Sequence, residues 1–265
     1  ISRRRADDLT PVPVNDVPTE VLPLIDAINN HIARLTKMLQ ARRRFLADAA
    51  HQIRTPLAVL GTQAEYGGRQ SDVEEMRRTF DGMLNSIRGT RKMANQMLTL
   101  ARAEQAGELS LERLPIDMAE LVRDVAGDFA VLALKKNIDL AFEGAEAPMT
   151  VSGNATMLRE MVANLTDNAL RYTPVDGHVT LSVNRLSGRV VLCVNDDGPG
   201  IPESEHEHVF QRFYRILGNS GSEGSGLGLS IVREIILAHG GTVQLRPGMT
   251  GHCLCVEVSL PAFGL

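Results

Sequence analysis

One histidine, His51, lies in the middle of a long stretch with helical periodicity and is the first candidate for chemistry. Apolar residues recur at steps of three and four on both sides of it, from Ile28 to Leu60, which predicts a packed helical face. His51 falls between two positions of that face, Ala49 and Ile53, so we expect its imidazole to point to water. An exposed neutral imidazole is a nucleophile that needs an electrophile. A surface histidine is more often only a solvated side chain, so the rest of the sequence must decide.

Four short motifs far downstream form a second set of candidates. They are Asn164-Leu-Thr-Asp-Asn168 on a predicted helix, Asp196-Asp-Gly-Pro-Gly200 after an apolar strand, Phe210-Gln-Arg-Phe213, and Gly224-Ser-Gly-Leu-Gly-Leu-Ser230 at the start of a helix. The i, i+4 spacing places both amides of the first motif on one helix face. Glycines before a helix leave free backbone amides, which attract phosphate. Each motif alone is weak, but chance does not explain all four in this order.

The composition narrows the possible functions. The chain has 265 residues, room for about two domains, and 28 Lys plus Arg against 32 Asp plus Glu. This mild acidity argues against a nucleic-acid partner. A 43% hydrophobic content with 4% aromatic residues suggests helix-rich aliphatic packing. Cys193, Cys253 and Cys255 lack a metal-ligand spacing and indicate a reducing compartment. No apolar run reaches the ~18 residues of a membrane span.

Two long helices are predicted to position His51. The first runs from about 18 to 66, as one helix or two stacked end to end, with Pro56 bending it and Gly67-Gly68 ending it. The second starts at a capping box, Ser71-Asp-Val-Glu74, and runs to about Gln105. Their apolar seam is too long to stay exposed, which predicts a homodimer in which two hairpins form a four-helix bundle.

The character of the chain changes after Gly107. Predicted helices at about 117–135 and 154–171 alternate with β-rich runs at 138–142, 178–186, 189–195, 242–246 and 252–260. Ser187-Gly188 separates two of these runs as a two-residue hairpin. The expected fold is therefore multidomain, an all-α helical hairpin followed by an α+β two-layer sandwich of roughly 150 residues.

With both sets of motifs in view, the chain resembles the cytoplasmic part of a bacterial two-component sensor histidine kinase. The resemblance implies a partial HAMP module and linker at 1–40, a dimerisation and histidine phosphotransfer domain at 41–106, and a catalytic ATP-binding domain of the Bergerat type at 107–265. It implies autophosphorylation of His51 from Mg²⁺-ATP, transfer to an Asp of a response regulator, and dephosphorylation of that partner. The stretch from Phe45 to Gln52 is similar to a subgroup that senses tricarboxylates.

The resemblance also implies a cellular setting. The basic cluster Arg3-Arg-Arg5 is similar to a juxtamembrane segment on the cytoplasmic side. We therefore expect a cytoplasmic fragment of a bacterial inner-membrane protein, connected to the membrane only through a missing N-terminal transmembrane region. The expected partners are a second copy of the chain and the receiver domain of a response regulator.

Roles in the ATP-binding domain follow from the same resemblance. Asn168 matches a residue that ligates Mg²⁺ through its amide oxygen, in line with the preference of a hard cation for oxygen. Asp196 matches the carboxylate that accepts the adenine amino group. The other implied nucleotide contacts are Asn164, Arg171, Tyr172, Gly198, Gly200, Arg212, Gly224, Gly226, Leu227 and Gly228. Residues 203–225 are similar to a mobile lid over ATP.

One position departs from the pattern of the family. Gln52 stands where the family usually has Glu or Asp directly after the phosphoacceptor, so the proton acceptor for His51 is in doubt. Thr55, at i+4 from His51, matches a residue that positions water for dephosphorylation.

A rival class is the ATP-hydrolysing machines of the gyrase and Hsp90 type, which carry a water-activating Glu where this chain has Asn164. A third class is a non-catalytic dimeric scaffold that binds nucleotide only to signal.

Overall fold

The computed structural model describes residues 9–14, 18–106, 113–144, 148–216, 225–248 and 254–264. The chain divides into two compact units, residues 1–86 and 87–265. The boundary between them falls inside the second long helix, α2, which spans Val73–Ala106. The last turns of that helix therefore belong to the second unit.

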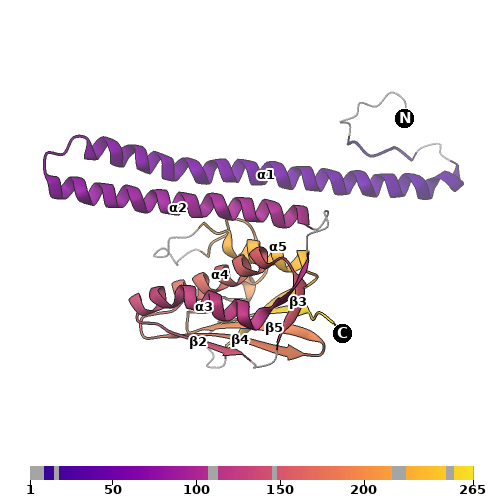
Figure 1. Ribbon diagram of the computed structural model, residues 1–265. Coiled ribbons are helices and arrows are strands. Elements are labelled where there is room, and N and C mark those ends of the chain that lie inside the picture. The colour runs from indigo at the N-terminus through magenta and orange to yellow at the C-terminus, as the bar shows by residue number, and fades with distance from the viewer. Residues whose placement is uncertain are drawn as a thin grey trace. The chain divides into compact units, whose positions relative to one another are not determined.

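The first unit is dominated by a single long helix (Figure 1). A 3-10 turn, η1 (Thr19–Val21), leads into α1 (Leu22–Gly67), which runs for 46 residues without a break. Pro56 lies inside α1. The alternative of two stacked helices is therefore wrong. The helix ends where predicted, with the Gly68 N–H donating to the Ala64 carbonyl at 3.0 Å.

The start of α2 differs from the predicted capping box. Instead of Ser71, the carboxylate of Asp72 accepts from the Glu74 N–H at 3.2 Å, and its carbonyl accepts from the Met76 N–H at 3.0 Å. Asp72 is therefore the N-cap, and the prediction of Ser71 is wrong. A carboxylate makes a charge-assisted bond to a helix N-terminus, whereas a hydroxyl makes a neutral one.

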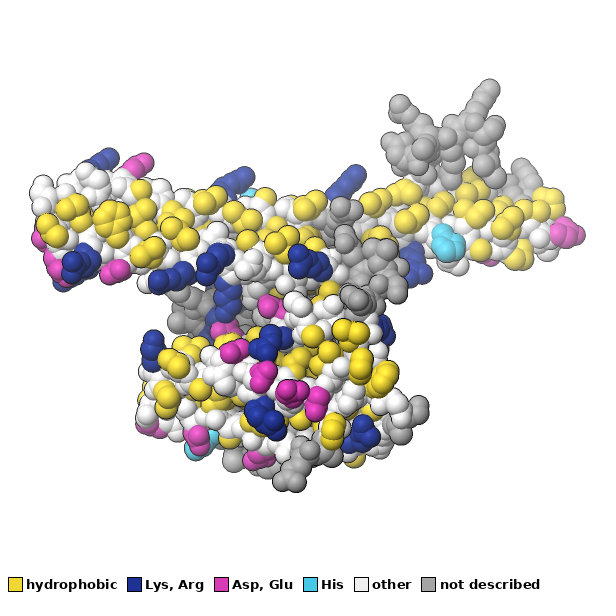
Figure 2. Space-filling view, in the orientation of Figure 1, with side chains coloured by type: hydrophobic (Ala, Val, Ile, Leu, Met, Phe, Trp, Pro, Cys, Tyr) yellow, Lys and Arg dark blue, Asp and Glu magenta, His cyan; other side chains and the backbone are white. Residues whose placement is uncertain are grey.

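Large apolar side chains remain exposed along both long helices, as Figure 2 shows. In the first unit they include Leu35, Met38, Leu39, Leu46, Leu57, Val59, Phe80 and Leu84. Phe80 keeps 60% of its surface in contact with solvent. An apolar face of this extent on a single chain is typical of a surface that another molecule covers.

The second unit is a two-layer α+β sandwich, as predicted (Figure 1). Its five-stranded sheet has the order β2-β4-β5-β7-β6, and only the β2–β4 pair is parallel among the described strands. The strands are β2 (Asp139–Gly144), β4 (His178–Leu186), β5 (Arg189–Asp196), β6 (Thr242–Pro247) and β7 (Leu254–Pro261). Helices α3 (Met118–Lys135), α4 (Ala155–Tyr172) and α5 (Gly228–Ala238) cover one face.

Several short elements were not predicted. Strands β1 (Leu114–Asp117) and β3 (Thr150–Gly153) pair with each other in a separate sheet. Two 3-10 turns, η2 (Glu203–Glu205) and η3 (His208–Phe210), follow β5. Elements of three or four residues are too short to show a period in the sequence.

The predicted hairpin between β4 and β5 is confirmed and sets the register of the sheet. Ser187 has φ 49° and Gly188 has φ 75°, the left-handed pair that a type I′ turn requires. Val190, Leu192, Val194 and Asp196 therefore alternate onto the buried face of β5. Asp196 is the last of them, so the register places a carboxylate at the edge of the core.

Helix α4 lies at the centre of the second unit. Its buried side chains include Met157, Leu158, Met161, Val162, Leu165, Ala169 and Leu170.

Neither the two long helices nor any other helix among the described residues has both the length and the apolar character of a membrane span.

Candidate functional site

His51 lies in the first unit, on the solvent-exposed surface of α1, as predicted. Gln52 and Thr55 are exposed beside it. The Thr55 hydroxyl lies 3.5 Å from the His51 carbonyl, at the long limit of a hydrogen bond. One turn further along, Ala58 and Thr62 line a shallow hollow with Thr55. The helix thus presents an accessible imidazole followed by a hydroxyl.

The two amides of the Asn164–Asn168 motif have different surroundings. The Asn164 Nδ2 donates to the Glu160 carbonyl at 2.8 Å and to the Glu160 Oε1 at 3.1 Å. The Asn164 Oδ1 accepts from the Gln96 Nε2 of α2 at 3.0 Å. Among the residues that the structure describes, none forms a hydrogen bond with the Asn168 side chain, so its amide oxygen is available to a ligand.

Gly228, the first residue of α5, lies directly against this pair. A Cβ added there would come within 3.3 Å of Asn168 Nδ2 and 3.5 Å of Asn164 Oδ1. The absence of a side chain therefore lets the N-terminus of α5 approach both amides. A helix N-terminus carries unpaired N–H groups and a partial positive charge, which suit a phosphate.

The glycine loop before α5 is fixed by the Phe210–Phe213 motif. The Phe213 N–H donates to the Gly226 carbonyl at 2.9 Å. Gly226 has φ +69°, and a Cβ there would meet the Phe213 backbone at 2.7 Å, so only glycine fits. Leu227 is fully buried. Gly224, also predicted here, lies outside the described residues.

Asp196 ends β5 as a buried carboxylate with 6% exposure. Burial raises its pKa to about 6, the Gly198 N–H opposes this rise, and the charge of Asp197 adds to it. Gly198 donates to the Asp196 Oδ1 at 2.9 Å, the one donor to this carboxylate within the described parts of the chain. A Cβ on Gly198 would lie 2.5 Å from that oxygen and 3.3 Å from the Tyr172 carbonyl of α4. Gly200 follows with φ 72°.

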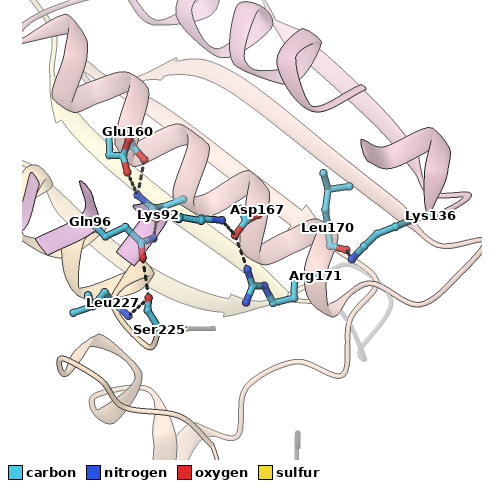
Figure 3. Close-up of polar contacts among 10 residues, drawn as sticks. Lys92, Gln96, Lys136, Glu160, Asp167, Leu170, Arg171, Ser225 and Leu227 are labelled. Carbon is cyan, nitrogen blue, oxygen red and sulfur yellow. Dashed lines mark hydrogen bonds and ion pairs between the residues drawn. The ribbon is translucent and has the colours of Figure 1, made fainter. Parts of the chain in front are cut away.

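The remaining predicted residues have protein partners or lie near the surface. Arg171 pairs with Asp167 at 2.9 Å, and Asp167 also pairs with Lys92 of α2 at 2.8 Å (Figure 3). Tyr172 is 40% exposed. Arg212 lies 3.9 Å from Glu234 on α5, and burial lowers its pKa while Glu234 opposes that shift.

The structure therefore assembles the downstream motifs along α4. The Asn164–Asn168 face of the helix meets the N-terminus of α5, and the Asp196–Gly198 turn packs at the end of α4 beside Tyr172. An amide oxygen, a helix N-terminus and a buried carboxylate suit, in turn, a hard cation, a phosphate and an amino-bearing base. Gln96 and Lys92 of α2 also reach this site, and the sequence motifs gave no indication of them.

Two family models match the chain. Residues 41–106 match the "His Kinase A (phospho-acceptor) domain", and residues 153–262 match the "Histidine kinase-, DNA gyrase B-, and HSP90-like ATPase". The first contains His51 and the second contains the site along α4.

Proteins similar in sequence or structure to this chain are named as sensor kinases or sensor proteins. The chain is 40% identical over 262 residues to the "Sensor protein kinase PmrB" of Pseudomonas aeruginosa, covering 98% of this chain and 54% of that protein. The chain thus spans about half the length of the curated relatives it matches. A solved structure of the "Mycobacterial sensor histidine kinase MprB" is 30% identical with a TM-score of 0.50, covering 58% of this chain and 99% of that one. The histidine kinase ThkA in complex with the response regulator protein TrrA shares the fold, at 23% identity with a TM-score of 0.61, covering 93% of this chain and 68% of that one.

The raised pKa of Asp196 predicts that this carboxylate destabilises the unliganded fold at neutral pH. A pKa of about 6, against 3.8 in the unfolded chain, means that the folded state holds the proton more tightly. The resulting loss of stability begins as the pH rises above about 4, and it is complete, at about 3 kcal/mol, above about pH 6. Asp196→Asn should therefore raise the melting temperature of the unliganded protein by roughly 6 to 12 °C at pH 7.

The gain should shrink as the pH falls from 6 to 4 in thermal melts followed by circular dichroism. The exposed Asp139→Asn serves as the matched control, with little change at either pH. A gain for Asp196→Asn that does not depend on pH would contradict the assignment of the cost to the ionised carboxylate.

Proposed function

This chain belongs to the sensor histidine kinases of two-component systems, and on that premise we propose that it is the catalytic core of such a kinase. Its reaction moves the γ-phosphoryl group of Mg²⁺-ATP to His51 and then to an Asp of a response regulator. The observation that carries the proposal is that one chain contains both an exposed histidine on α1 and a site along α4 that is suited to a nucleotide triphosphate. The kinase ThkA, of the same fold, was captured with a response regulator, which supports that class of partner.

The residues of the second unit bind and orient the nucleotide. Asp196 accepts the adenine amino group, and Gly198 lets the base approach the carboxylate. The N-terminus of α5, opened by Gly226 and Gly228, binds the phosphates. Asn168 would hold Mg²⁺ through its amide oxygen, and the metal would neutralise phosphate charge when bound. Arg171, now paired with Asp167, can exchange that partner for a phosphate.

His51 performs the transfer from the first unit. Its Nε2 attacks the γ-phosphorus in line, the bond to the bridging oxygen of ADP breaks, and the Nδ1 proton passes to an acceptor in the solvent. The phosphoryl group then moves from nitrogen to a carboxylate oxygen of the regulator. Thr55 orients the water that later hydrolyses the acyl phosphate, because its hydroxyl lies one turn after the histidine on the same exposed surface.

The chain acts as a homodimer within a longer receptor. The exposed apolar face of α1 and α2 is the surface that a second copy covers in a four-helix bundle. Residues 1–40 form the end of a HAMP module, in line with the helix from Leu22 onward. The complete protein is then an inner-membrane receptor with this part in the cytoplasm, and a tricarboxylate stimulus stays a prediction from the stretch before His51.

The hydrolytic alternative is disfavoured at one position. Asn164 occupies the place of the water-activating Glu, and an amide cannot take a proton from water. Its Nδ2 donates to Glu160, which lies one turn before Asn164 on α4, whereas Asn168 lies one turn after it. The site thus positions a triphosphate and leaves its acceptor to come from His51.

His51→Gln should abolish autophosphorylation while Mg²⁺-ATP affinity stays near that of the wild type, because the imidazole and the nucleotide site lie in different units. Incubation with γ-labelled ATP followed by tests of acid lability measures the first quantity, and equilibrium titration measures the second. Label that persists on the variant would place the phosphoacceptor elsewhere, with His31 of α1 the next candidate.

Asn168→Asp should lower the labelling rate about 10-fold or more, because a carboxylate beside the triphosphate adds charge and reshapes the metal shell. Titration with ATP in Mg²⁺ and in EDTA separates metal handling from nucleotide binding. Loss of affinity in Mg²⁺ alone is the expected result. A variant with normal labelling would remove Asn168 from the metal role.

Gln52→Glu should raise the rate of autophosphorylation about 10- to 100-fold at neutral pH, because a carboxylate both orients His51 and accepts its proton. Gln52→Ala should lower the rate modestly, through lost orientation alone. Single-turnover measurements of the three proteins provide the comparison. Equal rates for Gln, Glu and Ala would show that position 52 is only a solvated residue of α1.

A further inference from the structure

Gln96 of α2 joins the Asn164–Asn168 motif, which the proposed function assigns to Mg²⁺, to the glycine loop, which it assigns to the phosphates. Its Nε2 donates to the Asn164 Oδ1 at 3.0 Å. Its Oε1 accepts from the Ser225 hydroxyl at 2.8 Å (Figure 3). Ser225 in turn accepts from the Leu227 N–H at 3.2 Å, so the chain of bonds ends in the glycine loop. Gln96 is 6% exposed. Because this amide is shielded from water, losing either hydrogen bond without a replacement would cost free energy.

A neighbouring ion pair holds the same face of α2 against α4. Lys92, one turn before Gln96, reaches Asp167 at 2.8 Å, and Asp167 also binds Arg171 (Figure 3). The Lys92 side chain is 51% exposed, so solvent screens this pair and it contributes little energy. The ion pair aligns the two helices, whereas the buried bonds of Gln96 hold the motifs.

These bonds occupy groups that a bound nucleotide would use. Asn164 has its oxygen taken by Gln96 and its nitrogen taken by Glu160. The Ser225 hydroxyl is likewise directed at Gln96. Asn168, one turn further along α4, has no such partner among the described residues. The polar groups of Asn164 and Ser225 are therefore already hydrogen-bonded to other residues of the protein.

We propose that Gln96, Asn164 and Ser225 form an α2 latch, which is closed without nucleotide and which the phosphates of a bound Mg²⁺-nucleotide open. The inference rests on the proposed function, because the competitor for Asn164 and the glycine loop is the nucleotide. Binding must first break the two bonds of Gln96, so the closed latch weakens the apparent affinity. By linkage, a bound nucleotide shifts Gln96 away from both motifs by the same factor.

The surroundings of Gln96 show how the latch opens. Met97 and Leu100 of α2 are buried, so these turns of the helix stay packed. A cavity of about 280 Å³ lies beside Gln96, lined in part by Arg91 and Asn95. The carboxamide can turn into this space and find polar neighbours there. The latch is thus a side-chain switch that needs no departure of α2.

Gln96→Met keeps the length of the side chain and removes both hydrogen bonds, so it should leave the latch open. We expect Mg²⁺-ADP to bind this variant about 10-fold more tightly than the wild type, a difference of about 1.4 kcal/mol. Equilibrium titration followed by calorimetry measures the affinity, and a thermal melt checks folding. Arg102→Gln, an exposed residue of α2 that does not line this cavity, is the matched control and should bind as the wild type does.

A double-mutant cycle tests whether the parts act as one device. If Gln96 and Ser225 form one latch, Ser225→Ala should change the affinity more favourably in the wild type than in the Gln96→Met background, because only the wild type has a closed latch to open. Unchanged or weaker binding by a folded Gln96→Met would overturn the latch and make Gln96 a scaffold of the pocket. A wild type that binds no Mg²⁺-ADP would overturn the proposed function and the latch with it, whereas a wild type that binds as tightly as Gln96→Met overturns the latch alone.

Discussion

The two faces of α4 are the constraint on which the rest of the site depends. The 3.6-residue period commits Leu158, Met161, Leu165 and Ala169 to the core, and these side chains fix the rotation of the helix about its axis. The adjacent face, about a quarter turn around the helix, must then present the Asn164–Asn168 motif to the N-terminus of α5. Gly228 lies close enough to this face that a Cβ there would come within 3.3 Å of the Asn168 amide. Close packing on one face therefore sets the position of the polar groups on the other.

Asp196 shows that the same packing has a cost. The register of the β4–β5 hairpin places the carboxylate on the buried face of β5, and burial raises its pKa to about 6. A hydrogen bond from Gly198 offsets only part of that desolvation. A ligand that donates a hydrogen bond to the second oxygen would complete the compensation, which is why we propose an amino-bearing base at this position.

The sequence predicted the elements that have a strong period or a defined turn. Helices α3 and α4 and strands β4 and β5 lie within one or two residues of their predicted bounds, because alternation and the Ser187-Gly188 turn are local signals. The β1–β3 pair and the parallel β2–β4 pair were not predicted, since both join strands far apart in the chain. Ser71 and Asp72 are adjacent, and both are favourable N-cap residues, so the sequence did not distinguish them. In the structure Asp72 caps α2.

Local spacing in the motifs likewise identified the residues that we propose for the nucleotide, whereas it could not identify Gln96. It stands next to Met97, a position of the apolar seam, and a lone glutamine there gives no sign of what it contacts. Its partners are 68 and 129 residues away, in two different motifs. Contacts of that separation follow from tertiary packing and leave no spacing to read in one sequence.

The position of the boundary between the units gives α2 a part in both. Its first turns face α1, where the Ser86 hydroxyl reaches the Gln63 Oε1 at 3.3 Å, and its last turns carry Gln96 into the second unit. One helix therefore contributes side-chain contacts within each of the two units.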